Sequence, residues 1–280
     1  MRVRLAGLPV EVGPDGRLSP AQKLALEQIE SAPLLPGGVD RVLPGAAAIR
    51  LATEPPWAGS LGISPTGEPP AVTCDGEQVR IGSQGFRAVV SPADGTADLY
   101  AATGVGHSVE TVMRVLLSCR LPHLGGLPLH AAAIAMGTVG AVFYGVSGAG
   151  KSTLSECAPF PVLSDEAVVA MPFDGRWEVS SSGFWGTLDR STAPRGYLPL
   201  AGLFELHQDT STRIERLPAR RAFVSLLRVV TIPDSPPLWS AAVDALRRLV
   251  ESVPVYSFGW TPAIPPWGAI REAIGLPSAD

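Results

Sequence analysis

The 280-residue chain has few of the residues that build disulfide frameworks and metal centres. Its three cysteines are odd in number, widely spaced and free of any C-x-x-C pair, which argues against a disulfide framework and a zinc site. We expect Cys74, Cys119 and Cys157 to be buried structural thiols. Four histidines without an H-x-x-x-H pair offer little for a transition metal.

Basic charge and long apolar runs are also scarce. The formal charge is −4 and the pI is about 5.6, so the chain lacks the electrostatic footprint of a nucleic-acid-binding protein. We expect the short arginine clusters at 213–221 and 247–248 to be solvated helix faces or loop edges. No apolar run reaches the roughly 18 residues of a membrane span, and no signal-peptide pattern is present. We therefore expect a cytoplasmic protein without a membrane partner.

The residues that are present predict a mixed α/β protein of two domains. Hydrophobic residues make up 46% of the chain, enough for one large core or two modest ones. Residues 1–104 predict a small β-rich N-terminal domain, because short β runs alternate with turn signals such as Asp75-Gly76 and Asp94-Gly95. Residues 105–280 predict a second domain that contains the chemistry.

Periodicity and turn residues predict the individual elements. In the first domain we expect a helix that begins at Ser19-Pro20 and stops before Pro33, with strands at 2–12, 46–52, 71–75, 77–82, 85–91 and 97–101. In the second we expect Ser108 to cap a helix that ends near Pro122. Further helices are expected at 222–230 and 239–252, and strands at 127–135, 139–144, 162–163, 167–171, 177–180 and 253–258.

A glycine-rich loop follows the apolar run 139–144. Gly145, Gly150, Lys151 and Ser152 match the pattern G-x-x-x-x-G-K-[ST], in which backbone N–H groups surround a phosphate, the lysine reaches the β and γ phosphates, and the hydroxyl ligates Mg²⁺. The remaining predicted nucleotide-binding residues are Ser147, Gly148, Ala149 and Thr153. The order of strand, loop and helix distinguishes this stretch from a glycine- and serine-rich surface turn, and predicts a nucleoside triphosphate as ligand.

Two adjacent acids, Asp165 and Glu166, follow the loop closely. Asp165 lies fourteen residues after Lys151 (165 − 151), which leaves room for a short helix and one strand. A right-handed crossover would return this strand beside the first, with its carboxyl end near the loop. One carboxylate there can hold Mg²⁺ and the other can accept a proton from an attacking hydroxyl. A turn with solvated acids is the alternative.

These motifs resemble those of the bacterial HPr kinase/phosphorylase family and its shorter relatives. The matching segments are LHAA at 129–132, GVSGAGKST at 145–153, LSDE at 163–166 and GFWGT at 183–187. The resemblance covers roughly residues 105–260 and implies a P-loop core like that of ATP-dependent phosphoenolpyruvate carboxykinase. Relatives form oligomers, so it also allows a homo-oligomer.

The resemblance implies roles for individual residues. Lys151 and Ser152 match the phosphate-binding lysine and the metal-binding hydroxyl, and Asp165 and Glu166 match the paired aspartates of metal binding and acid/base transfer. His130 matches a histidine near the transferred phosphate, although an LHAAA histidine can equally be a satisfied core residue. Four features depart from the family pattern. The second acid is Glu166 and not aspartate, Pro159 and Pro161 cut short the helix after the loop, Thr153 stands where true HPr kinases carry an acid, and no equivalent of the HPr-gripping stretch is found.

The sequence therefore predicts an ATP- and Mg²⁺-dependent kinase that phosphorylates a hydroxyl, preferably serine, of a peptide, a protein or a small amino-acid-like acceptor. The short relatives found beside peptide natural-product genes favour a peptide. The rival hypothesis is an ATP-binding regulatory or scaffold protein without phosphotransfer. Trp185 is a candidate for the acceptor cleft, and three arginines are candidates for phosphate contact: Arg195, Arg213 and Arg216. Glu205, His207 and Asp209 are expected to be structural.

Overall fold

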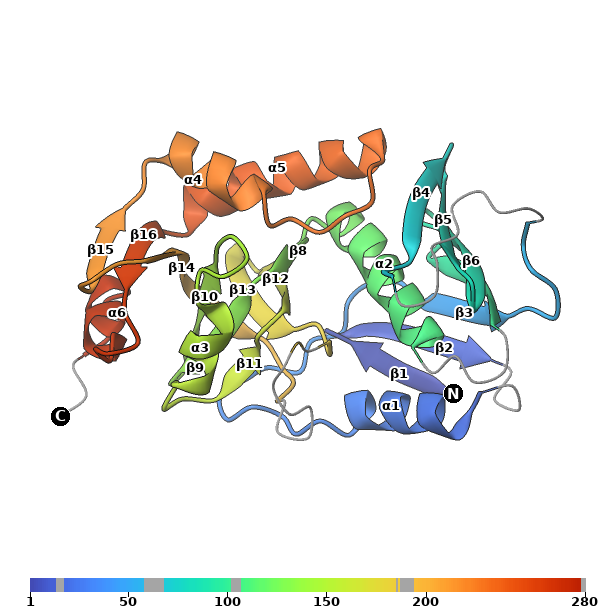
Figure 1. Ribbon diagram of the computed structural model, residues 1–280, viewed down its shortest axis with the longest axis horizontal. Coiled ribbons are helices and arrows are strands. Elements are labelled where there is room, and N and C mark those ends of the chain that lie inside the picture. The colour runs from blue at the N-terminus through green and yellow to red at the C-terminus, as the bar shows by residue number, and fades with distance from the viewer. Residues whose placement is uncertain (14–17, 58–67, 102–106, 185, 187–193, 278–280) are drawn as a thin grey trace. The chain divides into compact units, whose positions relative to one another are not determined.

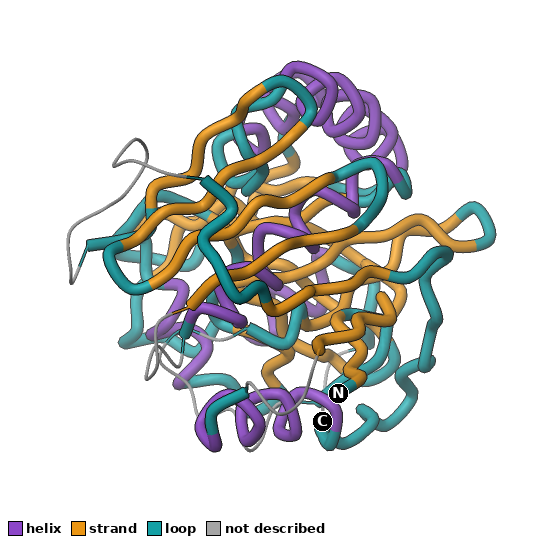
Figure 2. Tube along the Cα trace, turned by 90° about the vertical axis from the view of Figure 1, so that its right-hand side faces the viewer, coloured by secondary structure: helices purple, strands orange, loops and turns teal. Residues whose placement is uncertain are grey.

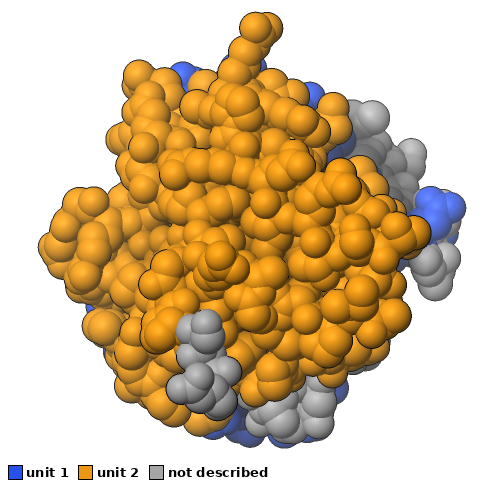
Figure 3. Space-filling model, turned by 90° about the vertical axis from the view of Figure 1, so that its left-hand side faces the viewer, with its two compact units in different colours: residues 1–31, 42–124, 232–241 blue, residues 32–41, 125–231, 242–280 orange. Residues whose placement is uncertain are grey.

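The computed structural model of the chain describes residues 1–13, 18–57, 68–101, 107–184, 186 and 194–277. The chain divides into two compact units, each with its own mixed β-sheet and few helices (Figure 1). Unit 1 comprises residues 1–31, 42–124 and 232–241; unit 2 comprises 32–41, 125–231 and 242–280, and Figure 3 shows one of its faces. The expected mixture of helices and strands is confirmed, and strands are prominent in the chain trace (Figure 2).

Unit 1 contains a sheet with the strand order β1-β2-β3-β7-β6-β5-β4. Its strands are β1 (Arg2–Leu5), β2 (Leu8–Gly13), β3 (Ala47–Leu51), β4 (Ala71–Asp75), β5 (Gln78–Ser83), β6 (Phe86–Ser91) and β7 (Thr96–Ala101). The single strand expected at 2–12 is a hairpin instead. Ala6 and Gly7 both have positive φ, at 46° and 82°, and form its two-residue turn.

Two helices belong to unit 1. In α1 (Pro20–Glu30), Ser19 accepts from the Gln22 amide and the Gln22 side chain accepts in return, so the expected start at Ser19-Pro20 is confirmed as a capping box. In α2 (Ser108–His123) the predicted cap is wrong. His107 is the N-cap residue, and Ser108 is the first helical residue, buried and hydrogen-bonded to Gln22. No helix among the described residues is long and apolar enough to cross a membrane.

Unit 2 contains a sheet with the strand order β11-β9-β10-β14-β13-β12-β8, extended by β16 beside β14 and β15 beside β16. The strands are β8 (Leu127–His130), β9 (Ala132–Met136), β10 (Val139–Tyr144), β11 (Val162–Ser164), β12 (Ala167–Phe173), β13 (Arg176–Ser181), β14 (Leu198–Gln208), β15 (Arg213–Arg216) and β16 (Val255–Trp260). The helices are α3 (Lys151–Glu156), α4 (Ala219–Leu227), α6 (Trp267–Ala273) and α5 (Pro236–Ser252), whose first residues group with unit 1.

The strand expected at 127–135 is interrupted at Ala131. β8 is the last strand at one end of the sheet order and pairs with β12. β9 lies near the other end of that order and pairs with β10. The Ala131 amide donates to the Glu166 carbonyl at 3.0 Å, and the His130 amide donates to the Val229 carbonyl at 2.7 Å. The break brings His130 to the start of β12, directly after the acidic pair.

The acidic pair reaches the loop by a different route from the one expected. β11, which precedes Asp165, does not lie beside β10; it pairs antiparallel with β9, which itself pairs antiparallel with β10. Two antiparallel steps restore the direction of β10, so both strands end at the same edge of the sheet. The crossover prediction was wrong in adjacency, but the predicted edge is confirmed.

The core of unit 2 lies on both faces of this sheet. Phe143 of β10 belongs to a buried cluster with Phe204 and Phe258 and with side chains of α3 and α6. On the other face, the buried Tyr144 hydroxyl lies 2.8 Å from the Ser225 hydroxyl of α4. The strand that precedes the glycine-rich loop is therefore held from both sides.

The units are interleaved in sequence, whereas the expected division was a single boundary after residue 104. Helix α2 groups with unit 1, and residues 32–41 group with unit 2. In that segment, Arg41 donates two hydrogen bonds to the buried Glu178 carboxylate, at 2.6 and 3.1 Å. This ion pair attaches an early part of the chain to β13.

Candidate functional site

The glycine-rich loop, residues 145–153, connects β10 to α3. Gly148 and Gly150 have positive φ, at 80° and 103°, a conformation that glycine adopts at little cost. Among the described residues, the amide N–H groups of Ser147, Gly148 and Gly150 donate to no acceptor. The Ala149 amide donates to the Val146 carbonyl at 3.1 Å. Unpaired amides in a curled loop form an anion-binding concavity.

The lysine of the loop is buried, unlike most lysines. Lys151 is 8% exposed, and its ammonium donates to the Gly145 carbonyl at 3.0 Å. Burial lowers the pKa of this ammonium from its ordinary value. Ser152 and Thr153, which follow it, are exposed. The ammonium therefore lies across the loop, and the two hydroxyl side chains beside it face solvent.

Two residues support the loop from neighbouring strands. Gln208, at the end of β14, donates from its side-chain amide to the Gly148 carbonyl at 3.0 Å. Trp260, at the end of β16, packs so closely that a Cβ on Gly150 would lie 3.1 Å from its ring. β14 pairs parallel with β10, and β16 pairs parallel with β14. All three strands therefore end on the side of the sheet where the loop lies. Neither residue is among the site residues predicted from the sequence, although a position at the end of a parallel strand is a usable signal.

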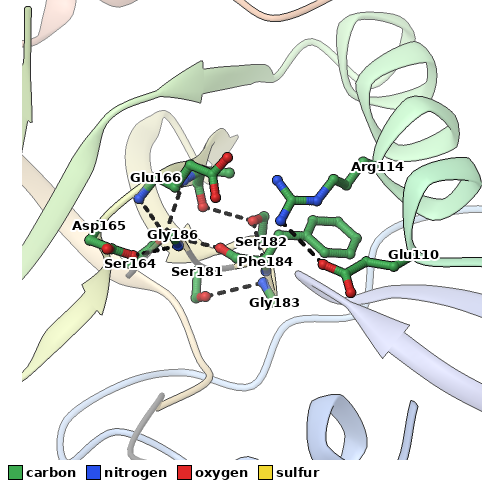
Figure 4. A network of polar contacts seen from close by, with 11 residues as sticks. Glu110, Arg114, Ser164, Asp165, Glu166, Ser181, Ser182, Gly183, Phe184 and Gly186 are labelled. Carbon is green, nitrogen blue, oxygen red and sulfur yellow. Dashed lines mark hydrogen bonds and ion pairs between the residues drawn. The ribbon is translucent and has the colours of Figure 1, made fainter. Parts of the chain in front are cut away.

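The acidic pair occupies a tight turn built by Ser164 (Figure 4). The Ser164 hydroxyl accepts from the amides of Glu166 and Ala167 and donates to the Phe184 carbonyl. A serine that bonds amides two and three residues on is a standard turn former, and the sequence analysis overlooked it. The turn fixes the backbone on either side of Asp165.

Asp165 and Glu166 have different surroundings. Asp165 is 4% exposed, and its Oδ1 accepts from the Gly186 amide at 2.8 Å (Figure 4). This contact places Gly186 of the 183–187 stretch beside Asp165, and Trp185, the candidate for the acceptor cleft, lies outside the described residues. Glu166 is partly exposed and acts electrostatically on His130. The Asp165 carboxylate is therefore fixed in position, and the Glu166 carboxylate is the more accessible of the two.

His130 connects the acidic turn to the loop electrostatically. Its imidazole pKa is lowered from the ordinary value, first by partial burial and then by the positive charge of Lys151, while Glu166 opposes the shift through its charge and a backbone hydrogen bond. His130 is exposed to solvent at the end of β8. The pairing of His130 with Ala167 and the bond from the Ala131 amide to the Glu166 carbonyl place His130 beside the acidic turn.

The other candidates lie elsewhere in unit 2. Arg195 contacts Asp40 at 3.3 Å, and Arg213 lowers the pKa of Asp209 as one of several causes that begin with the Thr210 amide. Arg216 ends β15. Cys119 is buried as expected, whereas Cys74 is partly exposed and Cys157, which follows α3, is exposed, so the prediction of buried thiols was wrong for these two.

A divalent cation would find few protein ligands here. Within the described ranges, no three His, Cys, Asp or Glu side chains cluster closely enough to hold a metal by themselves. The predicted set is smaller: the Ser152 hydroxyl with Asp165 and Glu166. Mg²⁺ commonly uses one or two carboxylates and completes its shell with water and substrate phosphates. The oxygen atoms of these three side chains are of the donor type that Mg²⁺ prefers, and a site built on them would need nucleotide phosphates and water to complete the shell.

No family model matches the chain, and the search of curated proteins found no match.

Proposed function

We propose that the chain is an ATP- and Mg²⁺-dependent phosphotransferase with an HPr kinase-like P-loop core, which transfers the γ-phosphoryl group to a hydroxyl of a peptide, protein or small acceptor. The observation that carries the proposal is the convergence of two features at one edge of the unit 2 sheet. The loop offers unpaired amides and a buried lysine, and the acidic turn with His130 ends at the same edge.

The loop and its lysine would bind the triphosphate. The amides of Ser147, Gly148 and Gly150 would donate to phosphate oxygens, and the Lys151 ammonium would leave the Gly145 carbonyl for the β and γ phosphates. Bound Mg²⁺–ATP would supply the phosphoryl group and neutralise part of its developing charge. Ser152 and Glu166 would hold the cation.

The acceptor side of the reaction would be served by Asp165. Phosphoryl transfer needs positioning and electrostatic stabilisation more than covalent help. Asp165 is held by the Gly186 amide, so its carboxylate can receive the acceptor hydroxyl's proton from a fixed position. His130, whose pKa is lowered, would stay neutral near pH 7 and would not compete with Lys151 for the phosphates.

The test incubates the purified chain with ATP, Mg²⁺ and serine-containing acceptors and follows ATP binding by calorimetry and acceptor phosphorylation by mass spectrometry. The wild type is expected to bind ATP and phosphorylate an acceptor, and Lys151→Ala to lose both. ATP binding without phosphorylation of any acceptor would support the rival, a regulatory or scaffold protein. An absence of ATP binding would reject both hypotheses.

A further inference from the structure

Four exposed arginines follow the chain from the end of β15 to the end of α4. We call them the arginine row: Arg216, Arg220, Arg221 and Arg228. Residues 216–233 contain these four cations and no aspartate or glutamate, in a chain whose total charge is −4. In the part of the chain that the structure describes, none of the four guanidinium groups has an ion-pair partner. The protein is acidic overall, and this segment therefore gives it a local positive surface.

Three members of the row, Arg220, Arg221 and Arg228, lie on the outer face of α4 and its C-cap. At about 100° per residue, Arg220, Arg221 and Arg228 project within one sector of about 100°. Val224 lies inside this sector and is 49% exposed. The opposite face of α4 is buried and includes Ser225, which bonds to Tyr144 of β10. The outer face thus combines cations with an exposed apolar side chain.

A groove adjoins the N-terminal end of the row, at Arg216. Its volume is about 490 Å³, and it lies between Arg216 and the end of α5. Most of its lining residues are apolar, but polar atoms contribute more of its exposed surface than apolar atoms; the lining includes Arg216, Leu217, Pro218, Ala222, Val250, Glu251 and Val253. Glu215 precedes Arg216, so the positive charge is concentrated on α4 and not on the strand.

The C-terminal end of the row, at Arg228, adjoins the candidate active site. Arg228 caps α4, and the carbonyl of the next residue, Val229, accepts the His130 amide at 2.7 Å. The nine residues of α4 span about 13 Å, the length of a short peptide segment. A chain laid along α4 from the groove would therefore arrive beside His130.

We propose that the arginine row and its groove form a docking surface for an acidic segment of the acceptor peptide. The inference rests on the proposed kinase function and adds the class of substrate: a peptide with carboxylates on one side of the phosphorylated hydroxyl. Carboxylates suit guanidinium groups because the two can bond bidentately. RNA is the less favoured polyanion, because the aromatic side chain of α4, Phe223, is only partly accessible for base stacking.

The experiment measures binding of a fluorescent serine peptide with a run of glutamates, and of a matched peptide with glutamines at those positions. The row variant is Arg216→Gln/Arg220→Gln/Arg221→Gln. A matched control with the same charge change is Arg2→Gln/Arg50→Gln/Arg176→Gln, at exposed positions outside the row. The wild type and the control should bind the acidic peptide about tenfold more tightly than the row variant, and added salt should weaken their binding.

Several results would overturn the proposal. They are equal binding of the two peptides by the wild type, unchanged binding by the row variant, and tighter arginine-dependent binding of a single-stranded RNA of equal charge. The Lys151→Ala variant separates the two proposals, since it should lose ATP and still bind the acidic peptide. The row variant should conversely keep its ATP affinity. Docking without phosphorylation would reject the kinase function and leave the docking surface standing.

Discussion

Gly186 tests the role of Asp165 without altering Asp165 itself. A Cβ built on Gly186 would lie 2.9 Å from Oδ2 of Asp165, and 3.3 and 3.4 Å from its Cγ and Oδ1. Gly186 is exposed, and the atoms that it would meet are the end of a side chain rather than backbone. Gly186→Ala should therefore fold, while the carboxylate moves.

The size of the effect follows from the geometry. Ordinary contact begins near 3.4 Å, so Oδ2 must retreat by about 0.5 Å. A misplacement of about 1 Å in an active site can cost about 100-fold in rate, so half of that displacement should cost about tenfold, or about 1.4 kcal/mol. The unfolding free energy should change by less than about 1 kcal/mol, because only a side-chain end is displaced.

The assay compares single-turnover phosphorylation of the acceptor with the thermal midpoint of unfolding. Gly268→Ala is the matched control, because a Cβ at Gly268 in α6 meets nothing within 4 Å. The control should transfer phosphate at the wild-type rate. Wild-type transfer by Gly186→Ala would refute the role given to the Asp165 position, and failure of the variant to fold would refute the estimate of its structural cost.

Three further predictions concern the loop, the ion pair and the histidine. Gln208→Ala removes the bond to the Gly148 carbonyl and should weaken ATP binding by about two- to tenfold in calorimetry; unchanged affinity would contradict the supporting role. Arg41→Ala leaves the Glu178 carboxylate buried and unpaired and should lower the unfolding free energy in urea by about 3 kcal/mol, whereas a loss below about 1 kcal/mol would contradict the burial argument. His130 has a lowered pKa in the folded state, so the unfolded chain binds its proton first; the wild type should lose stability relative to His130→Gln as the pH falls below about 6.5, and a constant difference would contradict the shift.

Local signals in the sequence predicted much of the fold. The capping residues at Ser19-Pro20 and the apolar run before Gly145 act within a few residues, and the structure contains both. The spacing of the loop and the acids was also enough to predict their common edge of the sheet. Short-range physical chemistry was sufficient in these places.

Long-range pairing could not be predicted from the same signals. The apolar sequence around Ala131 is compatible with one continuous strand. It forms two strands because β8 pairs with β12 and β9 pairs with β10, and the sequence around Ala131 does not show these partners. The pairing of β11 with β9 and the contact between Arg41 and Glu178, 137 residues apart, are of the same kind. Such contacts leave no periodic trace in the sequence.

Transfer of labelled γ-phosphate from ATP to a serine peptide by Asp165→Asn tests the central claim most directly, with ATP affinity measured on the same sample. If the loop and the acidic turn form one phosphotransfer site, this variant should bind ATP within about threefold of the wild-type affinity and lose at least about 100-fold in transfer rate. Transfer at the wild-type rate would contradict the account.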